Sequence, residues 1–145
     1  MIYKKSWKYI LFRDDSYYCM RYGYYKLKAI KDFSDVPKGK VEGFVMSYHN
    51  LSQTGDCWIY CRATVIDDAK VSENAKIKEF AYVSGKAKIF GNAIVSGNAV
   101  ILDNSKIFDN AQVSEYAQVC DIAQIYGNAN ICGFTKISRN KVIAK

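Results

Sequence analysis

The sequence contains no long hydrophobic run. No uninterrupted apolar stretch approaches the roughly 18 residues that a membrane-spanning helix needs. The first eight residues place three lysines around a tryptophan, without the apolar core and small-residue cleavage site of a secretory signal. These two absences predict a cytoplasmic protein that makes no membrane contact.

Patterns that mark common catalytic and metal sites are also missing. Neither a G-x-x-x-x-G-K-[ST] phosphate loop nor a nucleophile elbow occurs. Cys57 and Cys61 have a C-x-x-x-C spacing, but no second pair of cysteines or histidines completes the four ligands that zinc normally takes. The five cysteines are odd in number, and without a secretory signal we expect free thiols. We predict no metal and no cofactor, with Cys57 as a small interior residue.

Acidic residues are too few to balance the basic ones, and the imbalance lies near the N-terminus. The net charge is +7. Residues 1–31 carry six Lys and two Arg against two Asp, whereas residues 32–145 carry thirteen basic and twelve acidic residues. This distribution favours an acidic or polyanionic partner and makes the N-terminal segment one candidate binding site, with Lys4, Lys5, Lys8, Arg13 and Arg21.

From Cys57 onward the chain divides into six-residue units without an insertion. Over residues 57–140 the third position is Ile or Val in all fourteen units, and the first position is Ala in eleven. Positions one and three of a strand point to the same side, while Gly, Asp, Glu and Asn at positions five and six suit tight corners. The pattern predicts a parallel β-solenoid with eighteen residues per triangular coil. A β-sandwich is the alternative, but its loops vary in length.

This repeat resembles the hexapeptide-repeat family, whose coils are left-handed. The resemblance implies an all-β fold with a single-stranded left-handed parallel β-helix, although parallel crossovers are normally right-handed. We assign residues 1–56 to an N-terminal β cap and linker and residues 57–145 to the solenoid. Aromatic and β-branched residues are frequent over residues 7–31, which predicts a small antiparallel sheet in the cap.

The segment that leads into the repeats carries a second resemblance. Lys26-Leu-Lys-Ala-Ile-Lys-Asp-Phe33, His49-Asn-Leu-Ser52 and Gly55-Asp-Cys-Trp-Ile59 resemble the lead-in of bacterial and phage hexapeptide proteins labelled as transferases or polymer-forming proteins. The chain departs from that pattern at Glu42-Gly43-Phe44, where the family has Gly-Gly-Trp. The resemblance implies acyl transfer or, through its phage members, inhibition of a bacterial defence complex of the CRISPR type.

Stacked coils turn the sequence into a map of surface columns, because residues eighteen apart lie above one another. On the third face a lysine column runs beside an aromatic column: Lys70, Lys88 and Lys106 next to Phe90, Phe108 and Tyr126. Such columns suit stacked bases or a protein interface. Alternatively, the N-terminal segment or a sister subunit covers the aromatic column. We take these six residues as the candidate partner-binding site.

The second face carries an outward apolar patch. It consists of Ile66, Tyr82, Val100 and Leu102. Several apolar neighbours on a flat face are typical of a contact surface, so the patch predicts a homo-oligomer.

Histidine occurs once, at His49, which bears on catalysis. Acyltransferases of the hexapeptide family use a histidine as general base, usually near a loop that leaves a coil. His49 precedes the first unit, and no loop interrupts the fourteen units. The leading hypothesis is therefore a non-catalytic β-solenoid that self-associates and binds a protein, a nucleoprotein complex or RNA. The alternatives are a phage-encoded defence inhibitor and an acyltransferase using His49.

Overall fold

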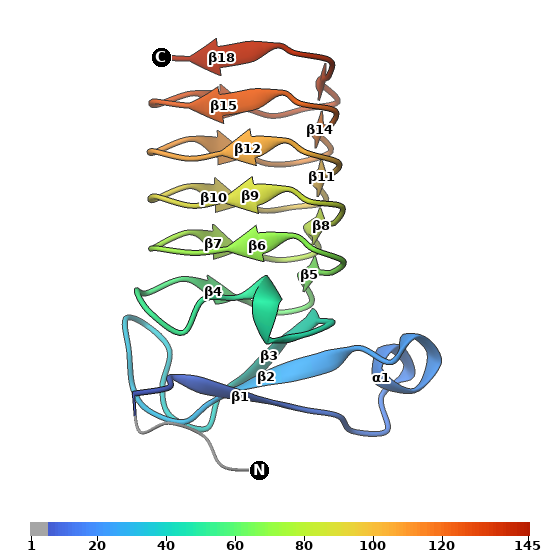
Figure 1. Ribbon diagram of the computed structural model, residues 1–145, viewed down its shortest axis with the longest axis vertical. Helices are drawn as coiled ribbons and strands as arrows, with labels where there is room; N and C mark the ends of the chain where they lie inside the picture. The colour runs from blue at the N-terminus through green and yellow to red at the C-terminus, as the bar shows by residue number, and fades with distance from the viewer. Residues whose placement is uncertain (1–5) are drawn as a thin grey trace.

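Within residues 6–145, which the computed structural model describes, fifteen short strands of the repeat region form three sheets of a triangular prism (Figure 1). The first face has β4 (Trp58–Ile59), β7 (Lys76–Ile77), β10 (Ile94–Val95), β13 (Gln112–Val113) and β16 (Asn130–Ile131). The second has β5 (Thr64–Val65), β8 (Tyr82–Val83), β11 (Val100–Ile101), β14 (Gln118–Val119) and β17 (Lys136–Ile137). The third has β6 (Lys70–Val71), β9 (Lys88–Ile89), β12 (Lys106–Ile107), β15 (Gln124–Tyr126) and β18 (Val142–Ala144).

The coils repeat every eighteen residues and wind in a left-handed sense. Each strand pairs in parallel with the strand one coil further on, as Ile94 pairs with Gln112. In Figure 1 the front strands of the third face point left and the first-face strands behind them point right, while the chain climbs toward its C-terminus. That path is left-handed, so the left-handed parallel β-helix predicted from the repeat is confirmed.

The interior is filled by positions one and three of each unit. Val95 and Ile101, at third positions near the middle of the prism, are both 0% exposed. The alanines at first positions, such as Ala93 and Ala99, are buried beside them. Small residues next to β-branched ones fill a narrow interior without voids, which confirms the predicted register.

The corners depend on the fifth residue of each unit. From Cys61 to Arg139, all fifth residues have a positive φ, between 54° and 71°. An L-residue there costs energy, and short polar side chains offset it through local hydrogen bonds. The Glu73 carboxylate accepts the N–H of Gly91 at 2.6 Å, one coil further on. Acidic residues at the corners therefore join successive coils.

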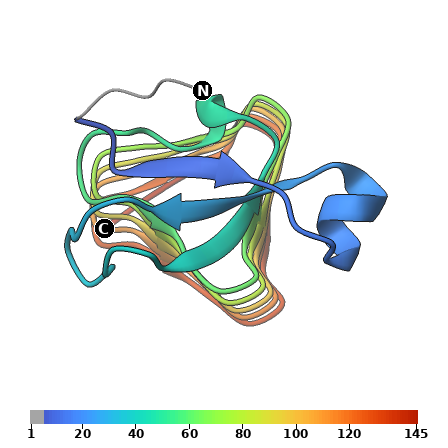
Figure 2. The ribbon, with the colours of Figure 1, turned by 90° about the horizontal axis from the view of Figure 1, so that it is seen from below.

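The cap is a three-stranded antiparallel sheet that continues into the solenoid. Its strands are β1 (Tyr9–Phe12), β2 (Tyr25–Ala29) and β3 (Val41–Val45), and β3 pairs in parallel with β5. Figure 2 shows these strands lying across the end of the prism. The antiparallel sheet expected over residues 7–31 is confirmed in β1 and β2, and β3 extends it.

Residues 1–56 and 57–145 share one hydrophobic core. Tyr9, Leu27 and Val45 of the cap are buried in the same cluster as the coil residues. After β3 the chain makes a short 3₁₀ turn, η1 (Tyr48–Asn50), and Leu51 then pairs with Val71 of β6. The boundary at residue 56 thus separates two sequence patterns that pack against each other.

One cap element differs from expectation. The tyrosine-rich stretch after Asp15 forms a helix, α1 (Tyr17–Tyr22), which leaves the prism sideways (Figure 2). Gly23 ends it with a φ of 71° and donates its N–H to the Cys19 carbonyl at 3.0 Å. Local turn chemistry at this glycine therefore prevails over the β preference of tyrosine. Over the part of the chain that the structure describes, no helix is long and apolar enough to cross a membrane.

Candidate functional site

The lysine column of the third face is exposed and in register. Lys70 pairs with Lys88, and Lys88 with Lys106, on strands β6, β9 and β12. Two ion pairs are found among residues 6–145, and neither involves these lysines. Acidic residues stand at both corners beside this face, and five of them accept a backbone N–H one coil further on: Asp67, Asp103, Asp121, Glu73 and Asp109. Asp68 is exposed beside Asp67 and forms no ion pair among residues 6–145. The column therefore presents positive charge without contacting counter-charges.

The aromatic column beside it forms a stacked ladder. The rings of Phe90 and Phe108 are 4.9 Å apart between centroids with planes 1° apart, and those of Phe108 and Tyr126 are 4.8 Å apart at 10°. No described segment passes in front of β9 and β12 in Figure 1, so the N-terminal segment does not cover this ladder. Coverage by a sister subunit stays a prediction.

Stacking changes what the ladder can bind. The ring faces between Phe90, Phe108 and Tyr126 are occupied by the neighbouring rings, which leaves the ring edges for other contacts. The expectation that this face holds stacked bases stays a prediction. Ring edges carry the positive end of the aromatic quadrupole and favour anions or carbonyl oxygens. Lysines and ring edges together make the third face electropositive.

The apolar patch of the second face is smaller than predicted. Ile66 is only 6% exposed, so its assignment as an outward interface residue is wrong. The chain after β3 runs beside it: the Asn50 side chain donates to the carbonyls of Asp67 and Ala69, and Met46 Sδ accepts the N–H of Asp67. Val100 and Leu102 are half-buried and Tyr82 is exposed. Their role in self-association stays a prediction.

His49 lies in the cap and is held by the backbone. The ring nitrogen Nε2 of His49 is 3.0 Å from the Asp68 carbonyl, and the backbone N–H of His49 donates to Ser47 Oγ. The side chain is exposed, on the outside of η1. His49 does not line either of the two hollows beside α1. The geometry therefore adds nothing to the hypothesis that His49 acts as a general base.

In the basic N-terminal segment Arg13 and Arg21 are exposed, whereas Lys8 is not available at the surface. Lys8 is 1% exposed, and its Nζ donates to the Cys57 carbonyl at 2.7 Å and contacts Cys57 Sγ at 3.3 Å. Burial lowers the pKa of Lys8 and raises that of Cys57. Lys8 therefore anchors the cap to the first coil. Lys4 and Lys5 lie outside the described residues. The cysteines are free, and Cys57 is interior as predicted.

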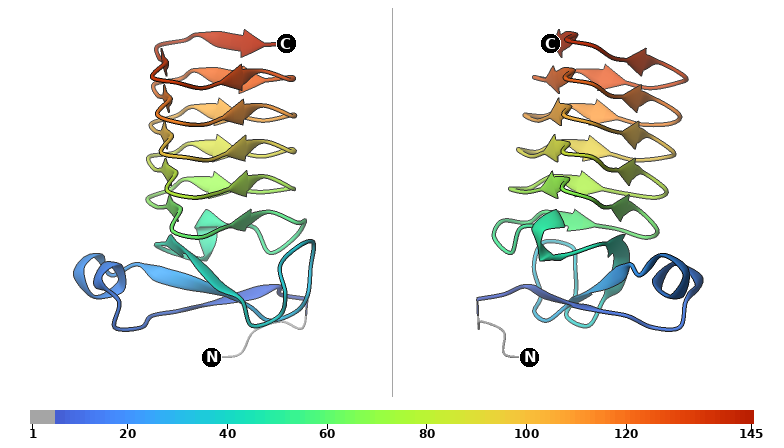
Figure 3. Two further views of the ribbon diagram at one scale, coloured as in Figure 1. Left: turned by 180° about the vertical axis from the view of Figure 1, so that it is seen from behind. Right: turned by 45° about the vertical axis from the view of Figure 1, so that its right-hand side comes forward.

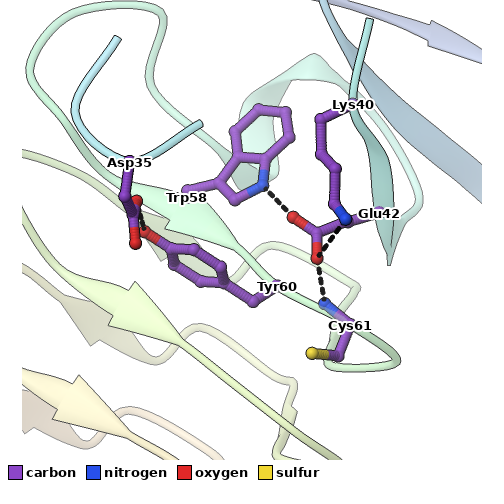
Figure 4. A network of polar contacts seen from close by, with 6 residues as sticks. All are labelled: Asp35, Lys40, Glu42, Trp58, Tyr60 and Cys61. Carbon is purple, nitrogen blue, oxygen red and sulfur yellow. Dashed lines mark hydrogen bonds and ion pairs between the residues drawn. The ribbon is translucent and has the colours of Figure 1, made fainter. Parts of the chain in front are cut away.

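A polar network joins the cap to the first coil (Figure 4). Glu42, the residue at which the lead-in departs from its family pattern, accepts the indole N–H of Trp58 at 2.9 Å and the backbone N–H of Cys61 at 3.1 Å. Nearby, the Tyr60 hydroxyl donates to Asp35 at 2.6 Å. The Glu42 bond satisfies the indole N–H of the buried Trp58, and the other bonds join the cap to the first coil, so we assign them a structural role.

One group of side chains has the composition of a cation site. The ligand atoms of Asp103, Cys120 and Asp121 lie within 4.8 Å of one another. Asp103 accepts the N–H of Asp121, and Asp121 accepts that of Arg139, as at the other corners. Burial raises the pKa of Cys120, which disfavours the thiolate that binds metals. These residues are therefore explained by corner structure.

Sequence reasoning missed the aromatic residues at the corner between the first and second faces. Sixth positions form a column there, whose members are Arg62, Phe80, Asn98, Tyr116 and Phe134. Tyr116 and Phe134 stack at 5.0 Å, and Phe80 is 59% exposed near the tyrosines of α1. The eighteen-residue spacing could have revealed this column. No feature of the sequence indicates that α1 lies beside the column.

Comparison with known proteins supports the architecture. A family model described as the YdcK β-solenoid repeat matches residues 87–103. No curated protein matches the chain. The matched segment begins at β9 and ends just after β11, so it spans nearly one complete coil. The repeat match and the stacked left-handed coils together support a β-solenoid architecture built from six-residue repeats.

Proposed function

We propose that this protein is a non-catalytic binding scaffold whose third face contacts an acidic surface of a protein partner. The observation that carries the proposal is the lysine column of β6, β9 and β12, which is exposed and lacks contacting acids among the described residues. Like charges roughly 5 Å apart repel one another, so the column costs the free protein some stability. An acidic partner relieves that repulsion.

The aromatic ladder favours a protein over a nucleic acid on this face. Its rings cover one another, so they offer flat contact area and ring edges instead of stacking faces. Carboxylates and main-chain carbonyls pair with ring edges, whereas bases need ring faces. A protein surface rich in Asp and Glu therefore fits both columns at once.

Binding of a labelled oligoglutamate peptide, followed by fluorescence anisotropy across a salt series, tests the proposal. Changing Lys70, Lys88 and Lys106 to Gln should weaken binding about tenfold and flatten its salt dependence, because each exposed charge pair contributes up to about 1 kcal/mol. Changing Phe90 and Phe108 to Ala should weaken binding a few-fold with little change in salt dependence.

A matched control separates local recognition from overall charge. The three exposed lysines Lys28, Lys38 and Lys136 lie away from the third face, and changing them to Gln removes the same net charge. This control should lose far less affinity than the column variant. Equal losses from the two variants would show that only diffuse charge attracts the peptide and would contradict the proposal.

We also propose that the protein self-associates through what remains of the second-face patch. Val100 and Leu102 are half-buried at its centre, and Tyr82 lies at its edge, where it lines the hollow beside α1. The phage-encoded defence inhibitor and the acyltransferase using His49 stay predictions that rest on the lead-in resemblance.

A further inference from the structure

A groove separates α1 from the corner between the first and second faces. Figure 3 shows the helix standing off from the side of the prism near its base. Two hollows fill the space, of about 300 and 400 Å³, and Tyr18 and Arg62 line both of them. The two hollows therefore adjoin at these two residues. This corner lies opposite the third face, so the groove is separate from the lysine column.

Aromatic rings form both walls of the larger hollow. On the α1 side Tyr18, Tyr22 and Tyr24 make a series of nearly parallel rings, with centroids 5.9 and 5.4 Å apart and planes 22° and 28° apart. The solenoid side contributes Phe80, which is 59% exposed, and Tyr82, which is 37% exposed. The groove thus has the composition of a stacking site rather than of a purely apolar pocket.

The rings of the solenoid wall, Phe80 and Tyr82, differ from those of the third-face ladder because they are not stacked on other rings. Among residues 6–145, no ring contact and no cation–π contact involves Phe80 or Tyr82. The two residues stand on either side of the buried Ala81 and are not stacked on each other. Neither ring is therefore occupied by another ring, unlike the rings of the Phe90–Phe108–Tyr126 ladder.

Arg62 supplies charge where the two hollows meet. It lies one coil below Phe80 in the same column and is exposed, and no ion pair of the described residues involves it. The other cation of the groove, Lys26, is paired with Asp14 at 2.7 Å. The acid of the groove, Glu42, already accepts two N–H donors. The guanidinium of Arg62 is therefore available to bind an anion.

We propose that this groove binds a segment of single-stranded nucleic acid. Bases stack on the rings of Phe80 and Tyr82, and a phosphate of the same segment pairs with Arg62. Unstacked aromatic rings beside an unpaired arginine are the combination that single-strand binding sites use, because every base has a stacking face and every link a phosphate. An acidic peptide would use Arg62 but would leave the rings without partners.

Fluorescence anisotropy with a labelled uridine oligonucleotide of about eight nucleotides tests the proposal. Changing Phe80 and Tyr82 together to Ala should weaken binding about tenfold or more, because each stacked base contributes measurably to affinity. Arg62→Gln should weaken binding severalfold and reduce the slope of log K against log salt by about 0.7, the value for one single-strand phosphate contact. An abasic oligonucleotide of equal length should bind more weakly and should not respond to the ring changes.

Two variants serve as matched controls. Phe134→Ala removes an 86% exposed ring from the same corner column, three coils above Phe80, and Lys88→Gln removes a charge from the opposite face. Each should change affinity by less than twofold. All of these positions point outward, and circular dichroism and thermal melting should match those of the wild type.

Several results would overturn the proposal. They are equal binding of the abasic and natural oligonucleotides, equal binding of duplex and single strand, an unchanged affinity of the Phe80, Tyr82 variant, and no measurable binding at low salt. An oligoglutamate peptide that competes fully and responds to Arg62→Gln but not to the ring changes would likewise show an anion site without base stacking.

Discussion

At the scale of single residues, the six-residue unit assigns each position one physical task. The third position is sealed inside the prism, and its neighbour at the second position points outward. Val100 and Ile101 of β11 illustrate the contrast, since Ile101 is 0% exposed and Val100 is half-buried at the surface. Substitutions at Ile101 and Val100 therefore compare a buried and a surface position on one strand.

Ile101→Asp should destabilise the protein by several kcal/mol, because it buries a carboxylate that has no partner in the interior. Val100→Asp, one residue away, should cost much less, since its side chain reaches solvent. Chemical denaturation followed by circular dichroism measures both free energies of unfolding. A fully folded Ile101→Asp variant with an unchanged melting temperature would refute the register.

Corner residues show how composition follows from backbone geometry. Gly91 has a φ of 64°, and a Cβ there would lie 2.8 Å from the backbone nitrogen of Asp109. Glu115 has a similar φ of 59°, yet its carboxylate accepts the N–H of Gly133 at 2.6 Å. Glycine removes the steric conflict, while an acidic side chain offsets it with a bond between coils. The frequent use of Gly, Asp and Glu at these corners follows from these two solutions.

At the scale of elements, the junction between cap and prism depends on a few polar bonds. Tyr60, just after β4, donates to Asp35 in the loop between β2 and β3. Burial and then this hydrogen bond raise the pKa of Tyr60, and the same bond holds the pKa of Asp35 below its ordinary value. The pair should therefore make stability depend on pH at both ends of the range.

Tyr60→Phe should lower the free energy of unfolding at neutral pH by about 1 kcal/mol, the usual contribution of one such bond. In the wild type, the Tyr60 contribution is complete below pH 10.0 and is lost as pH rises above it, because only the folded state retains the proton. The Asp35 contribution is present above pH 3.8 and is lost as pH falls below it.

Denaturant titrations across pH test these two dependences. The wild-type protein should lose stability relative to Tyr60→Phe both in alkali and in acid. The double variant with Asp35→Asn should add almost no further loss, since the partner is already gone. Parallel curves for the wild type and Tyr60→Phe would show that the bond does not contribute in solution.

At the scale of the whole molecule, flat faces and an exposed corner invite contacts with other molecules. Self-association through Val100 and Leu102 should give light-scattering masses that are multiples of the 16.5 kDa chain at micromolar concentration. Leu102→Glu should dissociate the oligomer, because a charge enters an apolar contact that should exceed about 1,000 Å². Lys136→Glu, on the same face but outside the patch, is the control. A wild-type protein that is monomeric throughout the concentration range would remove the prediction.

The sequence by itself determined the solenoid, its register and its surface columns. Each six-residue unit contains its own interior, strand and corner residues. Because the spacing is constant, only one register of stacking places every third position inside. The positions of Val95, Ile101, Lys88 and Phe90 could therefore be read without a structure. Left-handedness was the exception, because it came from resemblance to a family and not from the spacing.

Only the tertiary structure decided how the N-terminal cap changes the exposure of the surface columns. Packing between segments distant in sequence covers Ile66 and buries Lys8, and it sets Tyr18 of α1 across a groove from Phe80. The orientation of the rings could not be predicted either. The spacing places Phe108 above Phe90, but it does not say whether ring faces or ring edges meet solvent. Both outcomes depend on side-chain contacts in three dimensions, and such contacts leave no periodic trace in the sequence.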